Sequence, residues 1–319
     1  MASVPAGTPD VLNKFEDLSG VNSALYQNPY DALLEACHDD PVLIQARYDT
    51  HRTTRNAQQK AALLSPSFSG LNIDQILRKL EDQTIEPGFS DPRNCLVFWA
   101  RPPKHIRDLV DRVQTKLRES APGLWLMPIS NLHLTALEVT HSLTSPEILA
   151  LVEKLGDNVI KNMTDYPYQH RARLIKPMLS YDASAIALSF VPAASENLLG
   201  SRSPEDDTFS YHHLRRDLFN IATTESPVTI NSRYVVPSSH ITIGRFLTQE
   251  DHNSPEKMKR WIGAIEEINE MLFREFWPDD QAKDISMGEW IVGQEKGLDC
   301  REGVLWYGGG QTVRLGKGF

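Results

Sequence analysis

Cysteine is scarce in this chain of 319 residues, and its three copies (Cys37, Cys95 and Cys300) lie far apart. An odd number of cysteines without a Cys-x-x-Cys pair offers neither a disulfide framework nor a zinc knuckle. We therefore expect the three thiols to be buried and chemically inert.

Long apolar runs are missing as well. No stretch of eighteen apolar residues is present, so no membrane-spanning helix is expected. The first residues show neither the basic region nor the apolar centre of a secretory signal. We expect an intracellular, cytoplasmic protein without membrane association, with the nucleus as the alternative location.

Positive charge is not in excess, because the formal net charge at pH 7 is −9. Stable binding of long nucleic acid depends on many Lys and Arg contacts to phosphates and is therefore not expected. A small anionic ligand in a local pocket, or a short RNA end, stays compatible with this charge. The sequence also lacks an HExxH motif, a dense acidic cluster and a P-loop, so it predicts no metal and no cofactor.

The residues that are present suit a folded protein, since 40% of them are hydrophobic. Residues 1–90 carry helical patterns without a chemical motif and are predicted to form a helical N-terminal extension. Pro and Gly in "TIEPGFSDPRN" mark a connector, after which residues 91–319 read as one mixed domain.

Within 91–319 the hydrophobic periodicity alternates between the strand and helix types, which predicts an α+β fold. Ser145 is the expected N-cap of the second helix, with Pro146 at its first position. We predict strands over 95–102, 123–128, 132–139, 171–179, 184–192 and 238–246, helices over 103–120, 145–163, 211–224 and 255–276, and a closing strand pair over 288–297 and 303–316.

Two predicted strands contain the same short pattern, "HLTA" from His133 and "HITI" from His240. Chance gives about 0.1 occurrences of His, apolar, Thr, apolar in such a chain, so two are informative. Because side chains alternate along a strand, each histidine shares one face with the threonine two residues later, Thr135 or Thr242. "HRTT" at His51 lacks this alternation and lies in a helical setting.

Two imidazoles on opposite sides of a bound group suit phosphodiester cleavage. One neutral imidazole removes a proton from the attacking oxygen, while a protonated one supplies a proton to the leaving oxygen. The two threonine hydroxyls would hydrogen-bond the nonbridging oxygens, where charge builds up in the transition state. The residues leave open which histidine is the acid and which is the base.

The chain resembles the two-histidine (2H) phosphoesterase superfamily, which includes RNA-ligase-like 2′,3′-cyclic phosphodiesterases. The resemblance covers about residues 93–319 and rests on the two motifs, on "VFWARPPKHIRDLV", on "GLWLMPISNLHLTALEV" and on "RYVVPSSHITIGRF". It implies a two-lobed, pseudo-symmetric fold with antiparallel sheets facing a central cleft. It also implies metal-independent hydrolysis of a 2′,3′-cyclic nucleotide or related small cyclic phosphate to a 2′-phosphate. Such an activity would have a role in RNA processing.

The sequence departs from the family pattern near both motifs. Pro237 is separated from His240 by two serines, and Glu138 replaces an apolar residue. We expect Glu138 on the His133 face, where it either orients the imidazole or lies at the rim. Arg245 matches the family pattern and is a candidate phosphate ligand, although strict alternation from His240 aims it at the other face unless a bulge intervenes.

A nucleobase requires a flat ring for stacking. The candidates are Tyr181, Trp125, and, in the closing strand, Trp306 and Tyr307. Two alternatives to a cyclic phosphodiesterase stay open: an exonuclease or 2′,5′-oligonucleotide phosphodiesterase acting on short RNA, and a nucleotide-binding protein without turnover.

Overall fold

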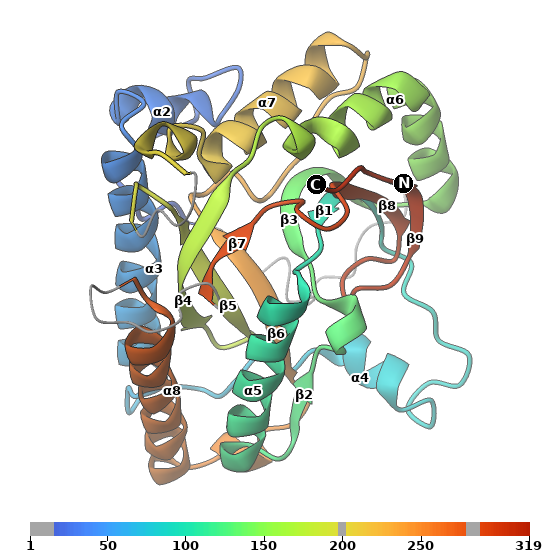
Figure 1. The fold of residues 1–319 in the computed structure, drawn as a ribbon. Helices are drawn as coiled ribbons and strands as arrows, with labels where there is room; N and C mark the ends of the chain where they lie inside the picture. Colours follow the sequence, from blue (N-terminus) through green and yellow to red (C-terminus); the bar gives the residue numbers. More distant parts are fainter. Residues whose placement is uncertain (1–15, 197–201, 279–287) are drawn as a thin grey trace.

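The computed structural model describes residues 16–196, 202–278 and 288–319 (Figure 1). Their elements confirm an α+β fold. The strands are β1 (Asn94–Ala100), β2 (Leu124–Leu126), β3 (Leu134–Leu143), β4 (Arg173–Tyr181), β5 (Ala185–Pro192), β6 (Ser239–Phe246), β7 (Trp290–Ile291), β8 (Leu298–Gly303) and β9 (Gln311–Leu315). The α-helices are α2 (Asp31–Ala36), α3 (Pro41–Leu63), α4 (Gln75–Glu81), α5 (Lys104–Ser120), α6 (Ser145–Asp165), α7 (Tyr211–Thr224) and α8 (Pro255–Phe276).

The nine described strands form one antiparallel sheet in the order β7-β4-β5-β6-β3-β1-β8-β9, and β2 pairs with β6. The resemblance implies antiparallel sheets that face a central cleft, whereas the described strands belong to one continuous sheet. The two halves of the sheet, β3-β1-β8-β9 and β7-β4-β5-β6, are continuous because Leu134 of β3 pairs with Ile241 of β6. The two motif strands are therefore neighbours.

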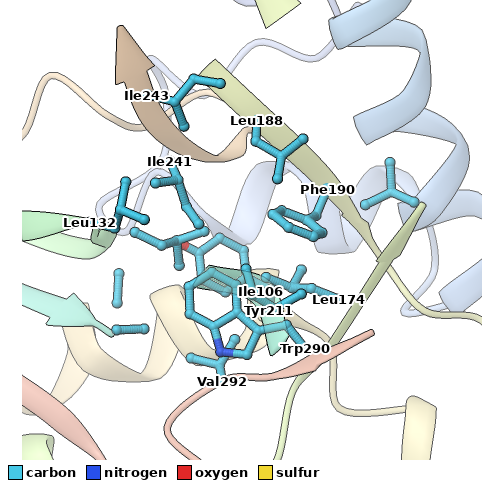
Figure 2. Packing of buried hydrophobic residues seen from close by; sticks show 14 of the residues in the cluster. Ile106, Leu132, Leu174, Leu188, Phe190, Tyr211, Ile241, Ile243, Trp290 and Val292 are labelled. Carbon is cyan, nitrogen blue, oxygen red and sulfur yellow. The ribbon is translucent and has the colours of Figure 1, made fainter. Parts of the chain in front are cut away.

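The hydrophobic core lies against the face of the sheet that carries Ile241 and Ile243. Figure 2 shows these two side chains together with Leu188 and Phe190 of β5 and with Ile106 of α5. Since Ile241 and Ile243 alternate with half-buried His240 and Thr242, packing of the apolar pair turns the motif side chains toward the opposite face. The expected alternation is confirmed in β6.

The predicted bounds are confirmed for α7 and α8, which span 211–224 and 255–276. The predicted N-cap of α6, Ser145, is wrong by one residue. The helix begins at Ser145, and its N-cap is Thr144, whose backbone N–H donates to the Glu147 carboxylate at 2.8 Å. Glu147 stands three residues after the cap, and this capping-box spacing selects Thr144.

The closing strand pair also differs from the prediction. β7 pairs with β4 at the far edge of the sheet, and the terminal pair is β8 with β9. Trp306 and Tyr307 lie in the turn between these strands rather than in a strand. Gly308 and Gly310 adopt positive φ angles, which differ from those of extended backbone, so the chain turns here instead of continuing as a strand.

The described part of the predicted N-terminal extension, residues 16–90, contains α2, α3 and α4. Its helix α3 contacts β4 and β5 and runs along that side of the sheet (Figure 1). His38 and Asp39, both at positive φ, separate α2 from α3. The three cysteines are buried, as predicted. None of the described helices is long and apolar enough to cross a membrane.

Candidate functional site

The four motif residues line one cavity of about 50 Å³, which we call the histidine cavity. His133 and Thr135 enter it from the start of β3, and His240 and Thr242 enter it from β6. All four side chains are half-buried. The structure thus brings together the residues that the two sequence motifs single out.

The register of the two strands fixes how these side chains lie. Because Leu134 pairs with Ile241 in an antiparallel ladder, His133 stands opposite Thr242, and Thr135 stands opposite His240. The two histidines are diagonal neighbours on one face, for which a Cα separation of about 7–8 Å is typical. The imidazoles line the histidine cavity from adjacent strands, not from two opposed sheets.

Each motif strand carries a β-bulge three residues after its histidine. In β3 the register shift leaves Ala136 without a partner on β1, and in β6 it leaves Ile243 without one on β5. A buried side chain from a helix satisfies the backbone at each bulge. Tyr211 of α7 donates to the Thr135 carbonyl at 2.7 Å, and Gln114 of α5 donates to the Ile243 carbonyl at 2.9 Å.

The two bulges bring a charged residue back to the histidine face. Strict alternation would turn Glu138 and Arg245, each five residues after its histidine, toward the core, yet both line the histidine cavity. Glu138 is held by Arg233, with Nη2 to Oε2 at 2.7 Å. Arg245 approaches Asp74 at 3.5 Å, and its Nε makes no hydrogen bond with any described residue.

His133 is held by a carbonyl and a ring. Its Nδ1–H donates to the backbone carbonyl of Asn131 at 2.8 Å, which leaves Nε2 as the unprotonated nitrogen of the neutral imidazole. The imidazole stacks on Trp99 with a centroid distance of 3.8 Å and an interplanar angle of 15°. The guanidinium of Arg101 lies over the same indole at 4.8 Å.

His240 has a different set of neighbours. Its Nδ1 lies 2.9 Å from the hydroxyl of Ser238, which either donates or accepts, so this contact leaves the tautomer open. The ring of Tyr234 is tilted at 46° with a centroid distance of 6.0 Å. Ser238 is one of the two serines by which the sequence departs from the family pattern.

Burial lowers the pKa of both imidazoles. The pKa of His133 falls to about 3, with a further lowering by Arg101 and by His240, while the Asn131 carbonyl opposes the change. The pKa of His240 falls to about 4, with Arg55 as the second cause and buried Arg215 as the third. Both pKa values lie well below 7, which favours the neutral form of each imidazole at pH 7.

A second cavity of about 120 Å³ adjoins the first, and we call it the α3 cavity. Residues His51, Arg52 and Arg55 of α3 form one side of it. The sequence of residues 1–90 shows no chemical motif, yet these three side chains line a cavity that adjoins the motif residues. The signal was missed because Arg52 and Arg55 lie on a helix whose pattern is that of an ordinary solvated face. The residues that line both cavities are Tyr234, His240, Thr242, Arg245 and Trp306.

The aromatic candidates separate into two groups. Trp306 lines both cavities, and Tyr181 lines the α3 cavity, where burial raises its pKa to about 12. Tyr307 lines neither cavity, because its hydroxyl donates to Asp74 at 2.8 Å. Trp125 packs edge-on against Tyr307 with a centroid distance of 6.0 Å and also lies outside the cavities.

Sequence reasoning missed Trp99 and Arg233. Trp99 lies in "CLVFWA", an apolar run buried on both faces, so alternation gave no sign that one face adjoins a cavity. Its cavity-side neighbours form a small separate cluster of Cys95, Val97, Trp99 and Leu305. Arg233 precedes the second motif in a segment without periodic pattern, and no signal in the sequence paired it with Glu138.

Over the described ranges, no group of three or more His, Cys, Asp or Glu side chains is placed to hold a metal ion. No family model and no curated protein matches the chain. Among solved structures, a conserved protein of unknown function (ATU0111) from Agrobacterium tumefaciens is similar at 12% identity and a TM-score of 0.42, over 73% of this chain and 92% of the other. TT0787 from Thermus thermophilus is similar at 16% identity and a TM-score of 0.29, over 48% and 75%.

Proposed function

We propose that this protein hydrolyses a phosphodiester by two-histidine acid–base catalysis, as a member of the 2H phosphoesterase superfamily, with a 2′,3′-cyclic nucleotide or related small cyclic phosphate as substrate. The observation that carries the proposal is the convergence of His133, Thr135, His240 and Thr242 on one cavity. The matched bulges, each followed by a charged residue at the same offset from its histidine, support the implied internal symmetry.

In this reaction a water oxygen attacks phosphorus while one neutral imidazole takes the water proton. The other imidazole, protonated, gives its proton to the leaving ribose oxygen as the P–O bond breaks, which yields a phosphomonoester. Thr135 and Thr242 donate to the nonbridging oxygens, and Arg245 offsets their charge. The bound anion favours the imidazolium, which supplies the protonated form that burial disfavours in the empty site.

The test is an assay of 2′,3′-cyclic nucleotides, 3′,5′-cyclic nucleotides and short 2′,5′- and 3′,5′-linked oligonucleotides with EDTA present. We expect hydrolysis of a 2′,3′-cyclic nucleotide with a bell-shaped pH profile, because one imidazole must be neutral and the other protonated. His133→Ala and His240→Ala are each expected to lower kcat by about 10² or more. His38→Asn, at an exposed position with positive φ, is the matched control and should keep full activity.

Other outcomes assign the alternatives. Preferred cleavage of oligonucleotides would assign the site to an exonuclease or 2′,5′-oligonucleotide phosphodiesterase. Tight binding of a nucleotide without turnover of any substrate would make the chain a nucleotide-binding protein and overturn the proposed hydrolysis. Full activity in both histidine variants would overturn the mechanism.

A further inference from the structure

The α3 cavity adjoins the histidine cavity and has lining residues in common with it. It shares His240 and Thr242 with the histidine cavity, and Arg245 and Trp306 also line both. A phosphate placed beside His133 and His240 therefore has its other substituents within reach of the residues of α3. The side chains that line the α3 cavity determine which substituent fits there.

The floor of the α3 cavity is a shelf of small side chains on three adjacent strands. Thr242 of β6 pairs with Ala187 of β5, and Ala187 pairs with Ser180 of β4, so the three form one row across the sheet. Ala185 lies beside Arg245 in the next row. Small side chains along this row leave space above the sheet for a flat group.

One wall of the cavity carries both a donor and an acceptor. Arg55 of α3 donates through Nη2 to Oδ2 of Asp182, and no other hydrogen bond of Arg55 to a described residue is present. Asp182 is fixed in turn, because its Oδ1 accepts from the backbone N–H groups of Ser184 and Ala185. The pair offers unused guanidinium N–H groups next to a carboxylate of fixed position.

These groups suit a nucleobase better than a second phosphate. A second phosphate would face the carboxylates of Asp182 and Glu16. Each of the three guanidinium groups that line the cavity already has a carboxylate partner: Arg52 with Asp49, Arg55 with Asp182 and Arg245 with Asp74. A nucleobase uses both donors and acceptors at its edge, and its faces contact apolar walls. Such walls are supplied by Tyr181, Val236 and Trp306.

We infer that the α3 cavity binds the base of a nucleotide substrate, with Ala187 as part of its floor and the Arg55–Asp182 pair at its hydrogen-bonding edge. This inference rests on the proposed function and deepens it. The N-terminal extension then selects nucleotides over other cyclic phosphates, since α3 supplies one side of the base subsite.

The experiment compares four 2′,3′-cyclic nucleotides with glycerol 1,2-cyclic phosphate, which has no base, on the full chain. Ala187→Leu fills the shelf, and Arg55→Met removes the donors. Exposed α3 positions supply matched controls in Ala57→Leu and Gln58→Met. Because Arg55 also lowers the pKa of His240, the effect of each variant is compared between substrates: we expect kcat/KM for at least one cyclic nucleotide to fall about tenfold or more relative to kcat/KM for glycerol cyclic phosphate.

Equal losses on nucleotide and base-free substrates, or no loss on any nucleotide in Arg55→Met, would overturn the base subsite while leaving hydrolysis intact. If no substrate is turned over, the proposed function fails, and calorimetric binding of the same cyclic nucleotides decides the subsite separately. Weaker binding in Arg55→Met and Ala187→Leu than in the controls would support it. Unchanged binding, or no binding at all, would overturn it. Arg55→Met, at a partly exposed helix position, provides the answer if Ala187→Leu fails to fold.

Discussion

His133 and His240 are the two residues of the proposed proton transfers, and they have different neighbours. His133 stacks on Trp99, and its Nδ1–H donates to a carbonyl, so one ring orientation and one tautomer are fixed. His240 contacts the hydroxyl of Ser238, which accepts or donates. The comparison teaches that the first imidazole is rigidly presented, whereas the second is able to exchange its Nδ1 proton without losing its contact.

The origin of the neighbouring charges also differs. Arg101, beside the first histidine, comes from the chain segment directly after β1, within the region that resembles the superfamily. Arg55, which acts on the second histidine, comes from the extension. The half of the site around His240 is thus the half that the extension modifies.

The largest effects are expected from the threonines, which stand opposite the histidines of the other strand. Thr135→Val and Thr242→Val keep the side-chain shape and remove the hydroxyl, and each is expected to lower kcat by about 10² to 10³. Steady-state kinetics measure this loss, with Thr53→Val on exposed α3 as the control. A loss confined to one variant would show that a single strand stabilises the transition state, against the two-sided arrangement.

A smaller effect is expected from Gly308, which supports the His133 side alone. Its φ is +80°, and an added Cβ would lie 2.4 Å from Cβ of Asn131, whose carbonyl holds His133. Gly308→Ala should cost about 1–3 kcal/mol of unfolding free energy and lower kcat. Urea denaturation measures the first, with Gly263→Ala as the control because nothing lies within 4 Å of its added Cβ. Unchanged stability would show that the turn adapts.

Acid is expected to weaken the fold through both histidines. Their pKa values are about 3 and about 4 in the folded chain, below the usual 6.5, so the unfolded chain takes up protons first as the pH falls from 6.5 to 4. Stability is full above pH 6.5 and falls below it. Between pH 7 and pH 5 each histidine should account for about 1–2 kcal/mol.

Urea denaturation at the two pH values tests this in wild type, His133→Gln and His240→Gln. Each variant should lose less stability on acidification than wild type does. A loss equal to that of wild type in both variants would place the acid sensitivity in other buried histidines, such as His212.

The smallest effect separates the two electrostatic settings. Arg55→Met is expected to raise the pKa of His240 and leave that of His133 in place, and Arg101→Met should do the reverse. NMR titration of the imidazole Cε1–H signals measures both values. Parallel changes of both imidazoles in either variant would contradict the division into two settings.

Much of this arrangement follows from local sequence. The apolar positions Ile241 and Ile243 predict that His240 and Thr242 face away from the core, and helices α7 and α8 have the predicted bounds. Strand β8 was missed because "LDCREG" mixes charged and apolar residues on a strand paired on both sides. The order of polar and apolar residues in one segment does not predict which neighbouring strands or side chains will bind its polar groups.

The two bulges cannot be predicted from the local sequence, for a different reason. Residues distant in sequence satisfy the bulge at Ile243, because its carbonyl accepts from the side chain of Gln114 at 2.9 Å and from the backbone N–H of Met127 at 3.0 Å. Glu138 reaches the His133 face through the bulge at Ala136, whereas the prediction relied on alternation, which gives the wrong parity. The same argument applies to Arg55, since only the packing of α3 on β4 and β5 brings it to the site.

Leu134 and Ile241 are the residues through which β3 and β6 pair in the described chain. One residue pair restrains the two halves of the sheet less than the longer ladders within each half do, and this junction lies between the two motifs. Under the proposed function, the relative position of the halves therefore sets the separation of the two imidazoles. Helix α7 holds one half from the core side, since Tyr211 donates to the Thr135 carbonyl of β3, and no residue of α7 lines either cavity.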